Sequence, residues 1–124
     1  MFEIFQKYEY TPPLSRYTYE PALFFFYGTL TDPSQLQEVL QLPEPPVFKA
    51  APVSSRKIML RGQYPALVNG APDDFVKGMA YSVETEEHEK MLEYYETDAY
   101  DVVGARILVG GEKVPGRTFQ WSGD

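Results

Sequence analysis

Apolar and polar residues alternate along the chain in a pattern that predicts strands interleaved with helices. Residues 23–27, LFFFY, form a short continuous apolar run, which is typical of a strand buried on both faces. In the polar stretch that follows, three apolar residues share one helical face: Leu36, Val39 and Leu40. Asp32 suits the N-cap of this helix and Pro33 suits its first position. The prolines of LPEPP then stop it.

The rest of the chain predicts short strands and a second helix. VFKAAPV, RKIML and PALV, within residues 47–69, predict strands separated by turns, and residues 75–83 predict one continuous strand. Residues 84–96 predict a helix capped by Thr85, with acidic residues in the first turn, where the helix dipole favours them. VVGARILV and VPGRTFQW predict a hairpin of two strands joined at GGEK.

This order of elements predicts an α+β fold. With so many strands in 124 residues, we expect a small mixed β-barrel or curled sheet with flanking helices rather than an open doubly wound sheet. Residues 23–124 suffice for one domain with one core. Residues 1–22 form an aromatic-rich extension without periodicity. This extension is either a loosely packed arm or a segment whose aromatic side chains cover the domain or contact a partner.

Charge and composition exclude several classes of function. The net charge of −7 repels phosphate backbones, so we expect no nucleic-acid partner, although backbone amides can still hold a small anion. Cysteine is absent, which excludes disulfides and thiolate chemistry. Charges interrupt the apolar residues near the N-terminus, and no stretch approaches a membrane span. We therefore expect a soluble, cytoplasmic protein; the sequence does not predict its oligomeric state.

The transition from the first strand to the first helix is a candidate binding loop. Tyr27, Gly28, Thr29 and Leu30 lie there, just before the N-terminus of a helix. Glycine permits a close approach of ligand and backbone, and a helix N-terminus favours negative charge. A small carboxylate or phosphate could bind to such a loop. A glycine that only makes a turn is the alternative interpretation.

Glu96 is the candidate for proton transfer. It follows Leu92 by one helical turn, on the shoulder of the apolar face, whereas Glu89 and Glu93 are expected to point further toward water. Partial burial and the helix C-terminus would both raise its proton affinity, which suits a general base that returns its proton. The alternative interpretation is that Glu96 is one more glutamate of an acidic helix. The single histidine, His88, is expected to be structural or to lie at the surface, and no histidine-rich metal site is possible.

Several motifs together resemble the gamma-glutamyl cyclotransferase-like family, most closely its small fungal and plant branch. They follow one another in that family's order over residues 23–124: FFYGTL, YPALV, VKGMAYSV, MLEYYETDAY and VPGRTFQWSGD. The resemblance implies a small β-barrel with flanking helices that acts on a small-molecule gamma-glutamyl substrate without cofactor or metal. The substrate's α-amine attacks its own γ-carbonyl, releasing 5-oxoproline and an amine.

The resemblance also implies roles for individual residues. The loop of Tyr27, Gly28, Thr29 and Leu30 would bind the glutamyl carboxylate, Glu96 would shuttle the proton, and Tyr100 would line the pocket. Asp101 departs from the family, where many members carry a basic residue, and relatives often continue past the position of Asp124. A non-catalytic ligand-binding or protein-interaction module on the same fold therefore remains the alternative to an enzyme.

Overall fold

The computed structural model describes residues 19–122. Most of the extension predicted at residues 1–22 lies outside this range. The described elements in chain order are β1 (Ala22–Phe26), a 3-10 turn (Thr29–Thr31), α1 (Pro33–Leu40), β2 (Lys49–Ala50), β3 (Val53–Ser54), β4 (Arg56–Arg61), β5 (Tyr64–Asn69), β6 (Phe75–Val76), β7 (Met79–Val83), α2 (Glu86–Glu96), β8 (Tyr100–Val109) and β9 (Glu112–Trp121).

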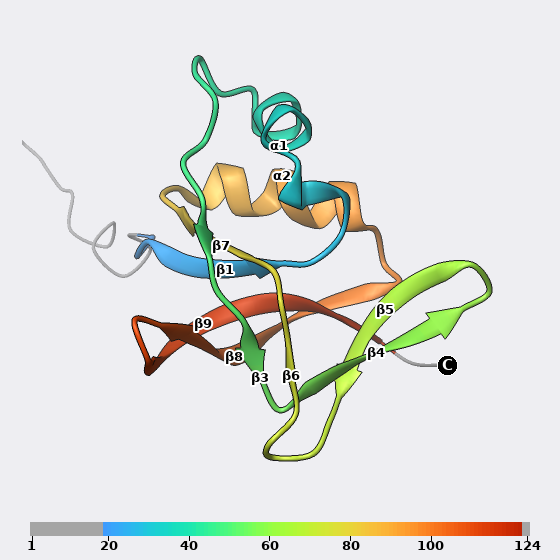
Figure 1. The fold of residues 1–124 in the computed structure, drawn as a ribbon. Coiled ribbons are helices and arrows are strands. Elements are labelled where there is room, and N and C mark those ends of the chain that lie inside the picture. The colour runs from blue at the N-terminus through green and yellow to red at the C-terminus, as the bar shows by residue number, and fades with distance from the viewer. Residues whose placement is uncertain (1–18, 123–124) are drawn as a thin grey trace, which may run out of the picture.

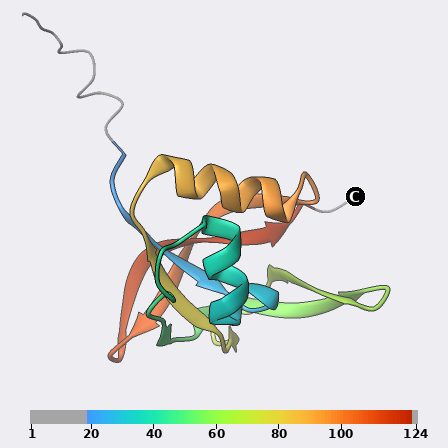
Figure 2. The same cartoon turned by 90° about the horizontal axis from the view of Figure 1, so that it is seen from above.

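A curled seven-stranded sheet forms the body of the molecule, in the order β2-β7-β1-β9-β8-β3-β6. β1 pairs antiparallel with β7 and parallel with β9, so the sheet is mixed. β4 and β5 form a separate hairpin that projects beyond the sheet, and α1 and α2 lie together over the opposite side of the sheet (Figures 1 and 2). This arrangement confirms the predicted α+β class with a barrel-like sheet and flanking helices.

The interior strand β1 is buried on both faces, as its apolar run predicts. Phe24, Phe25 and Phe26 are 0%, 1% and 3% exposed. Because successive side chains of a strand point to opposite faces, Phe24 and Phe26 pack in the core beneath the helices, while Phe25 packs in a second core with Leu67 of β5. The end of β1 is therefore held firmly between two packed layers.

Both helices begin where their capping residues predict. The Asp32 side chain accepts a hydrogen bond from the Ser34 N–H at 3.0 Å, and Pro33 opens α1. The Thr85 hydroxyl accepts from the His88 N–H at 3.1 Å at the start of α2. The apolar faces of the two helices then pack on the sheet through buried side chains, among them Leu36, Leu40 and Leu92.

The prediction of one continuous strand over residues 75–83 is wrong, because the chain forms two strands there, β6 and β7. A Cβ at Gly78 would lie 2.3 Å from the carbonyl oxygen of Phe26 and 2.5 Å from the ring of Phe25. Glycine is required there because the chain passes directly against β1. Beyond this point the strand changes partner, from β3 to β1 and β2.

Candidate active site

A pocket of about 660 Å³ opens where β1 ends, next to the C-terminal end of α2 and the β4–β5 hairpin. Its described lining residues are Phe25, Phe26, Tyr27, Gly28, Thr29, Leu30, Arg61, Tyr64, Pro65, Tyr95, Glu96, Thr97, Tyr100, Phe119 and Trp121. All six site residues expected from the sequence are among them. Residues from opposite ends of the sequence are thus brought to one cavity.

The loop after β1 forms one wall of this pocket. It makes a 3-10 turn, in which the Gly28 carbonyl accepts from the Thr31 N–H at 3.0 Å and from the Thr31 hydroxyl at 2.7 Å. Both bonds have the Gly28 carbonyl oxygen as their acceptor. The first N–H groups of a helical turn, by contrast, have no hydrogen-bond acceptor within that turn. A Cβ at Gly28 would meet no atom within 4 Å, so the loop borders open space. A ligand carboxylate can approach this backbone closely.

Glu96 is the last residue of α2 and lies half-buried in the pocket wall. Burial raises the pKa of its carboxyl from 4.5 to about 7, because a charged carboxylate is less stable away from water. The direction agrees with the expectation from the sequence. Glu96 can therefore both accept and donate a proton near neutral pH.

Two tyrosines lie beside Glu96. The Tyr27 hydroxyl accepts a hydrogen bond from the Leu67 N–H of β5 at 3.2 Å and shares another with the hydroxyl of Tyr100. Burial raises the pKa of both phenols, and the negative charge of Glu96 raises them further. Both tyrosines therefore stay neutral. One O–H group is engaged in the hydrogen bond that they share, and the other can donate to an oxygen in the pocket.

The aromatic and cationic residues at the other side of the pocket were not predicted. The guanidinium carbon of Arg61 lies 4.9 Å from the centre of the Trp121 ring, and this ring meets Tyr100 edge-on at 5.7 Å. Tyr64 and Pro65 follow on β5. YPALV and the segment containing Trp121 were visible as motifs, but only the folded hairpin places them in the pocket.

The expectation that Glu89 points toward water is wrong. Its side chain is 12% exposed, and its Oε1 accepts from Arg117 at 2.7 Å and from the Tyr19 hydroxyl at 2.8 Å. Glu89 sits where α2 crosses β9 and the chain entering β1, so it faces the sheet. Glu93 is exposed, as expected. Asp101 is also exposed and is not among the described residues that line the pocket.

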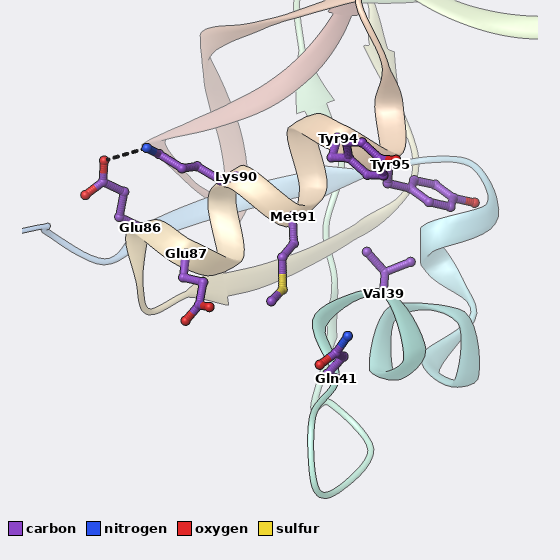
Figure 3. Close-up of a pocket in the computed structure, with 8 residues that line it drawn as sticks. All are labelled: Val39, Gln41, Glu86, Glu87, Lys90, Met91, Tyr94 and Tyr95. Carbon is purple, nitrogen blue, oxygen red and sulfur yellow. Dashed lines mark ion pairs between the residues drawn. The ribbon is translucent and has the colours of Figure 1, made fainter.

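A second hollow, of about 860 Å³, lies between α1 and α2 (Figure 3). Its described lining includes Val39, Met91 and Tyr94, and a Lys90–Glu86 ion pair of 3.6 Å lies at its rim. None of the six expected site residues lines it. The six residues expected from the sequence therefore line the Glu96 pocket and not this hollow.

The fold and the pocket define a class of small α+β domains. Such a domain has a curled mixed sheet, two helices on one side of it and a pocket at the strand-to-helix turn. A family model described as gamma-glutamyl cyclotransferase, AIG2-like, matches residues 24–124. The chain therefore belongs to this family. The resemblance to its small fungal and plant branch stays a prediction.

Solved structures share the fold. Two Arabidopsis thaliana proteins solved in solution superimpose with TM-scores of 0.71 and 0.70, at 20% and 23% identity. They cover 82% and 84% of this chain, which spans 62% and 70% of theirs. A structure titled gamma-glutamyl cyclotransferase has a TM-score of 0.64 at 14% identity, covering 83% of this chain and 68% of its own. This chain thus spans less than two thirds of the first of these proteins.

No curated protein matches the chain. Within residues 19–122, no helix has the length and apolar character needed to cross a bilayer, and no cluster of three or more His, Asp or Glu side chains could hold a metal ion.

Proposed function

We propose that this protein is a gamma-glutamyl cyclotransferase that converts a gamma-glutamyl amine or peptide to 5-oxoproline and a free amine. The observation that carries this proposal is the half-buried Glu96, whose pKa is about 7, in the pocket walled by Tyr27–Leu30. It is the one anionic side chain among the described lining residues. Membership of the family supports the same reaction.

The proposed reaction is intramolecular. The Glu96 carboxylate takes a proton from the substrate's α-ammonium group, and the resulting amine attacks the γ-carbonyl carbon. A carbon–nitrogen bond closes the five-membered ring. The bond from the same carbon to the leaving nitrogen then breaks as Glu96 returns its proton to that nitrogen. The ring nitrogen loses its second proton to Glu96, which passes it to the departing amine, so the amine leaves as an ammonium ion. No water is consumed, and Glu96 ends the cycle as it began.

The remaining residues bind and orient. The backbone N–H groups of the Gly28–Leu30 loop hold the glutamyl carboxylate, with the help of the partial positive charge at the start of α1. The neutral hydroxyls of Tyr27 and Tyr100 share one hydrogen bond, and the O–H group that this bond does not engage can donate to an oxygen of the substrate. The amine and the carbonyl belong to the same molecule, so the protein contributes by binding the substrate in the folded conformation that holds one against the other.

The proposal requires neither cofactor nor metal, since one proton shuttle and oriented donors suffice for this chemistry. The substrate is a small molecule, because the pocket has a volume of about 660 Å³. A cytoplasmic location remains a prediction from the sequence.

The test is release of 5-oxoproline from a panel of gamma-glutamyl amines and dipeptides. Wild type should release it, and Glu96→Gln should lower kcat/KM by at least about a hundredfold, since general acid–base catalysis contributes 10²–10⁴-fold. Glu93→Gln is the matched control, because it makes the same change at an exposed position one turn earlier.

Full activity in Glu96→Gln would overturn the proton shuttle. If the folded wild-type protein released no 5-oxoproline from any compound of the panel, the proposal that it is an enzyme would be wrong. In that case, binding of the same compounds without turnover would support the alternative of a ligand-binding module.

A further inference from the structure

The hollow between α1 and α2 has an apolar floor that the described residues leave open. Val39 and Met91 are half-buried and pack against the core beneath the helices, and Figure 3 shows them pointing from α1 and α2 toward the space between. Tyr94 borders the same space and is 89% exposed. An exposed apolar surface of this kind is typical of a binding surface, so a covering segment is expected.

The chain enters the described structure close to this hollow. Tyr19 is the first described residue, and its hydroxyl donates a hydrogen bond to Oε1 of Glu89 on α2 at 2.8 Å. Glu86, which lines the hollow, lies about one turn before Glu89 on the same helix. Residues 1–18 are therefore tethered to a helix that forms one wall of the hollow.

The tether is long enough to reach the whole hollow. An extended chain spans about 3.3 Å per residue, so ten residues before Tyr19 reach about 33 Å. Helix α2 has 11 residues and is therefore only about 16 Å long. A tethered segment also binds as if it were present at high concentration, so weak apolar contacts suffice to hold it.

The side chains of residues 1–18 suit an apolar floor. Five of these residues are aromatic: Phe2, Phe5, Tyr8, Tyr10 and Tyr17. Aromatic rings bury a large apolar area and make favourable contacts with the sulfur of a methionine, which Met91 offers in the hollow. The extension thus supplies the kind of surface that the hollow lacks.

Charge favours this segment over a second copy of the chain. Residues 1–18 have no net charge, because they hold two acidic and two basic side chains: Glu3, Glu9, Lys7 and Arg16. The net charge of −7 therefore falls entirely on the rest of the chain. Two such bodies repel each other, whereas a neutral segment approaches the hollow without this repulsion.

We propose that residues 1–18 pack their aromatic side chains into the α1–α2 hollow of their own chain and cover it. This cover is separate from the proposed cyclotransferase reaction, and its test needs no activity. Tyr95 lines both this hollow and the Glu96 pocket. The cover would therefore rest against a residue that the two cavities share.

The experiment measures how fast a thiol reagent modifies a cysteine introduced into the hollow of the full-length chain. The chain has no cysteine of its own, so Met91→Cys gives a single signal. We expect modification to be about tenfold slower with the native extension than with Phe2→Ser, Phe5→Ser and Tyr8→Ser combined. A tenfold difference corresponds to a hollow covered for about nine-tenths of the time.

Glu93→Cys is the matched control, because Glu93 is exposed on the same helix and does not line the hollow. Its rate should be the same with either extension. Equal rates for Met91→Cys with both extensions would overturn the cover. So would an equal acceleration at both positions, which would show that the serine substitutions loosen helix α2.

The dependence on protein concentration distinguishes the chain's own segment from a second copy. Protection of Met91→Cys by a tethered segment should not change over a hundredfold dilution. Protection that is lost on dilution would assign the hollow to a second copy and overturn the proposal.

Discussion

The hydroxyl of Tyr95 lies 2.7 Å from Oγ1 of Thr29, which joins helix α2 to the loop after β1. The same hydroxyl accepts a weaker hydrogen bond from Gln35 of α1 at 3.4 Å. Tyr95 is the residue before Glu96. The proposed carboxylate-binding loop and the proposed proton shuttle are therefore fixed relative to each other by one side chain.

Tyr95→Phe should loosen this connection without unfolding the protein. A neutral hydrogen bond contributes about 1 kcal/mol, which corresponds to roughly a fivefold rise in KM for a gamma-glutamyl substrate. Tyr94→Phe is the control, since Tyr94 is 89% exposed. Steady-state kinetics on both variants checks the prediction, and an unchanged KM in Tyr95→Phe would show that the loop is positioned without this bond.

The rate should depend on pH through Glu96. The proposed general base works only as a carboxylate, and the pKa of Glu96 is raised to about 7. We therefore expect kcat/KM to rise about tenfold per pH unit well below pH 7 and to level off above it. A profile measured from pH 5 to 9 checks this. A midpoint near 4.5 would mean that the Glu96 carboxyl is solvated in the free enzyme.

The pH dependence of the free energy of unfolding should report the burial of Glu96 independently of activity. The pKa of Glu96 is higher in the folded state than its ordinary value of 4.5, so the folded state keeps a proton that the unfolded state releases between pH 4.5 and about 7. Ionisation of Glu96 therefore lowers the stability of wild type progressively across this window, by up to about 3 kcal/mol.

Glu96→Gln carries no such charge. Its free energy of unfolding should match that of wild type at pH 4 and exceed it increasingly up to pH 7, while Glu93→Gln should show no such trend. Denaturant unfolding at several pH values measures the difference. A constant difference would contradict a raised pKa at Glu96.

Two glycines near the end of β1 should respond in opposite ways to alanine. Gly28→Ala meets no atom within 4 Å, so the fold should persist while the methyl group obstructs the close approach of a ligand and raises KM. Gly78→Ala would place its methyl group 2.3 Å from the Phe26 carbonyl oxygen, and this clash should cost about 2 kcal/mol or more. Thermal unfolding and substrate titration separate the two effects. Equal melting temperatures would contradict the close packing at Gly78.

Glu89 should matter for stability more than for catalysis. Removing its charge leaves Arg117 without its partner and weakens the bond from Tyr19, so Glu89→Gln should cost about 1–3 kcal/mol. Glu93→Gln, on the same helix and exposed, should stay within about 0.5 kcal/mol of wild type. Urea unfolding compares the two variants. Equal midpoints would show that the Arg117 contact adds nothing.

The sequence by itself determined the features that depend on residues close together in the chain. Asp32, Pro33 and Thr85 predicted where both helices begin, because a cap satisfies N–H groups only two or three residues away. The apolar run of β1 predicted a strand buried on both faces. The motif order predicted the six expected site residues, which the fold brings to one pocket.

Tertiary structure alone decided the contacts between distant segments. Gly78 breaks a strand because β1 passes against it, and Glu89 turns to the sheet because Arg117 and Tyr19 lie there. The stack of Arg61 on Trp121 joins a hairpin to the last strand, sixty positions along the chain. Periodicity reports which face of an element is apolar, but it carries no information about which remote residue meets that face. The pairing and curvature of the sheet supply that partner, and with it the shape and charge of the pocket.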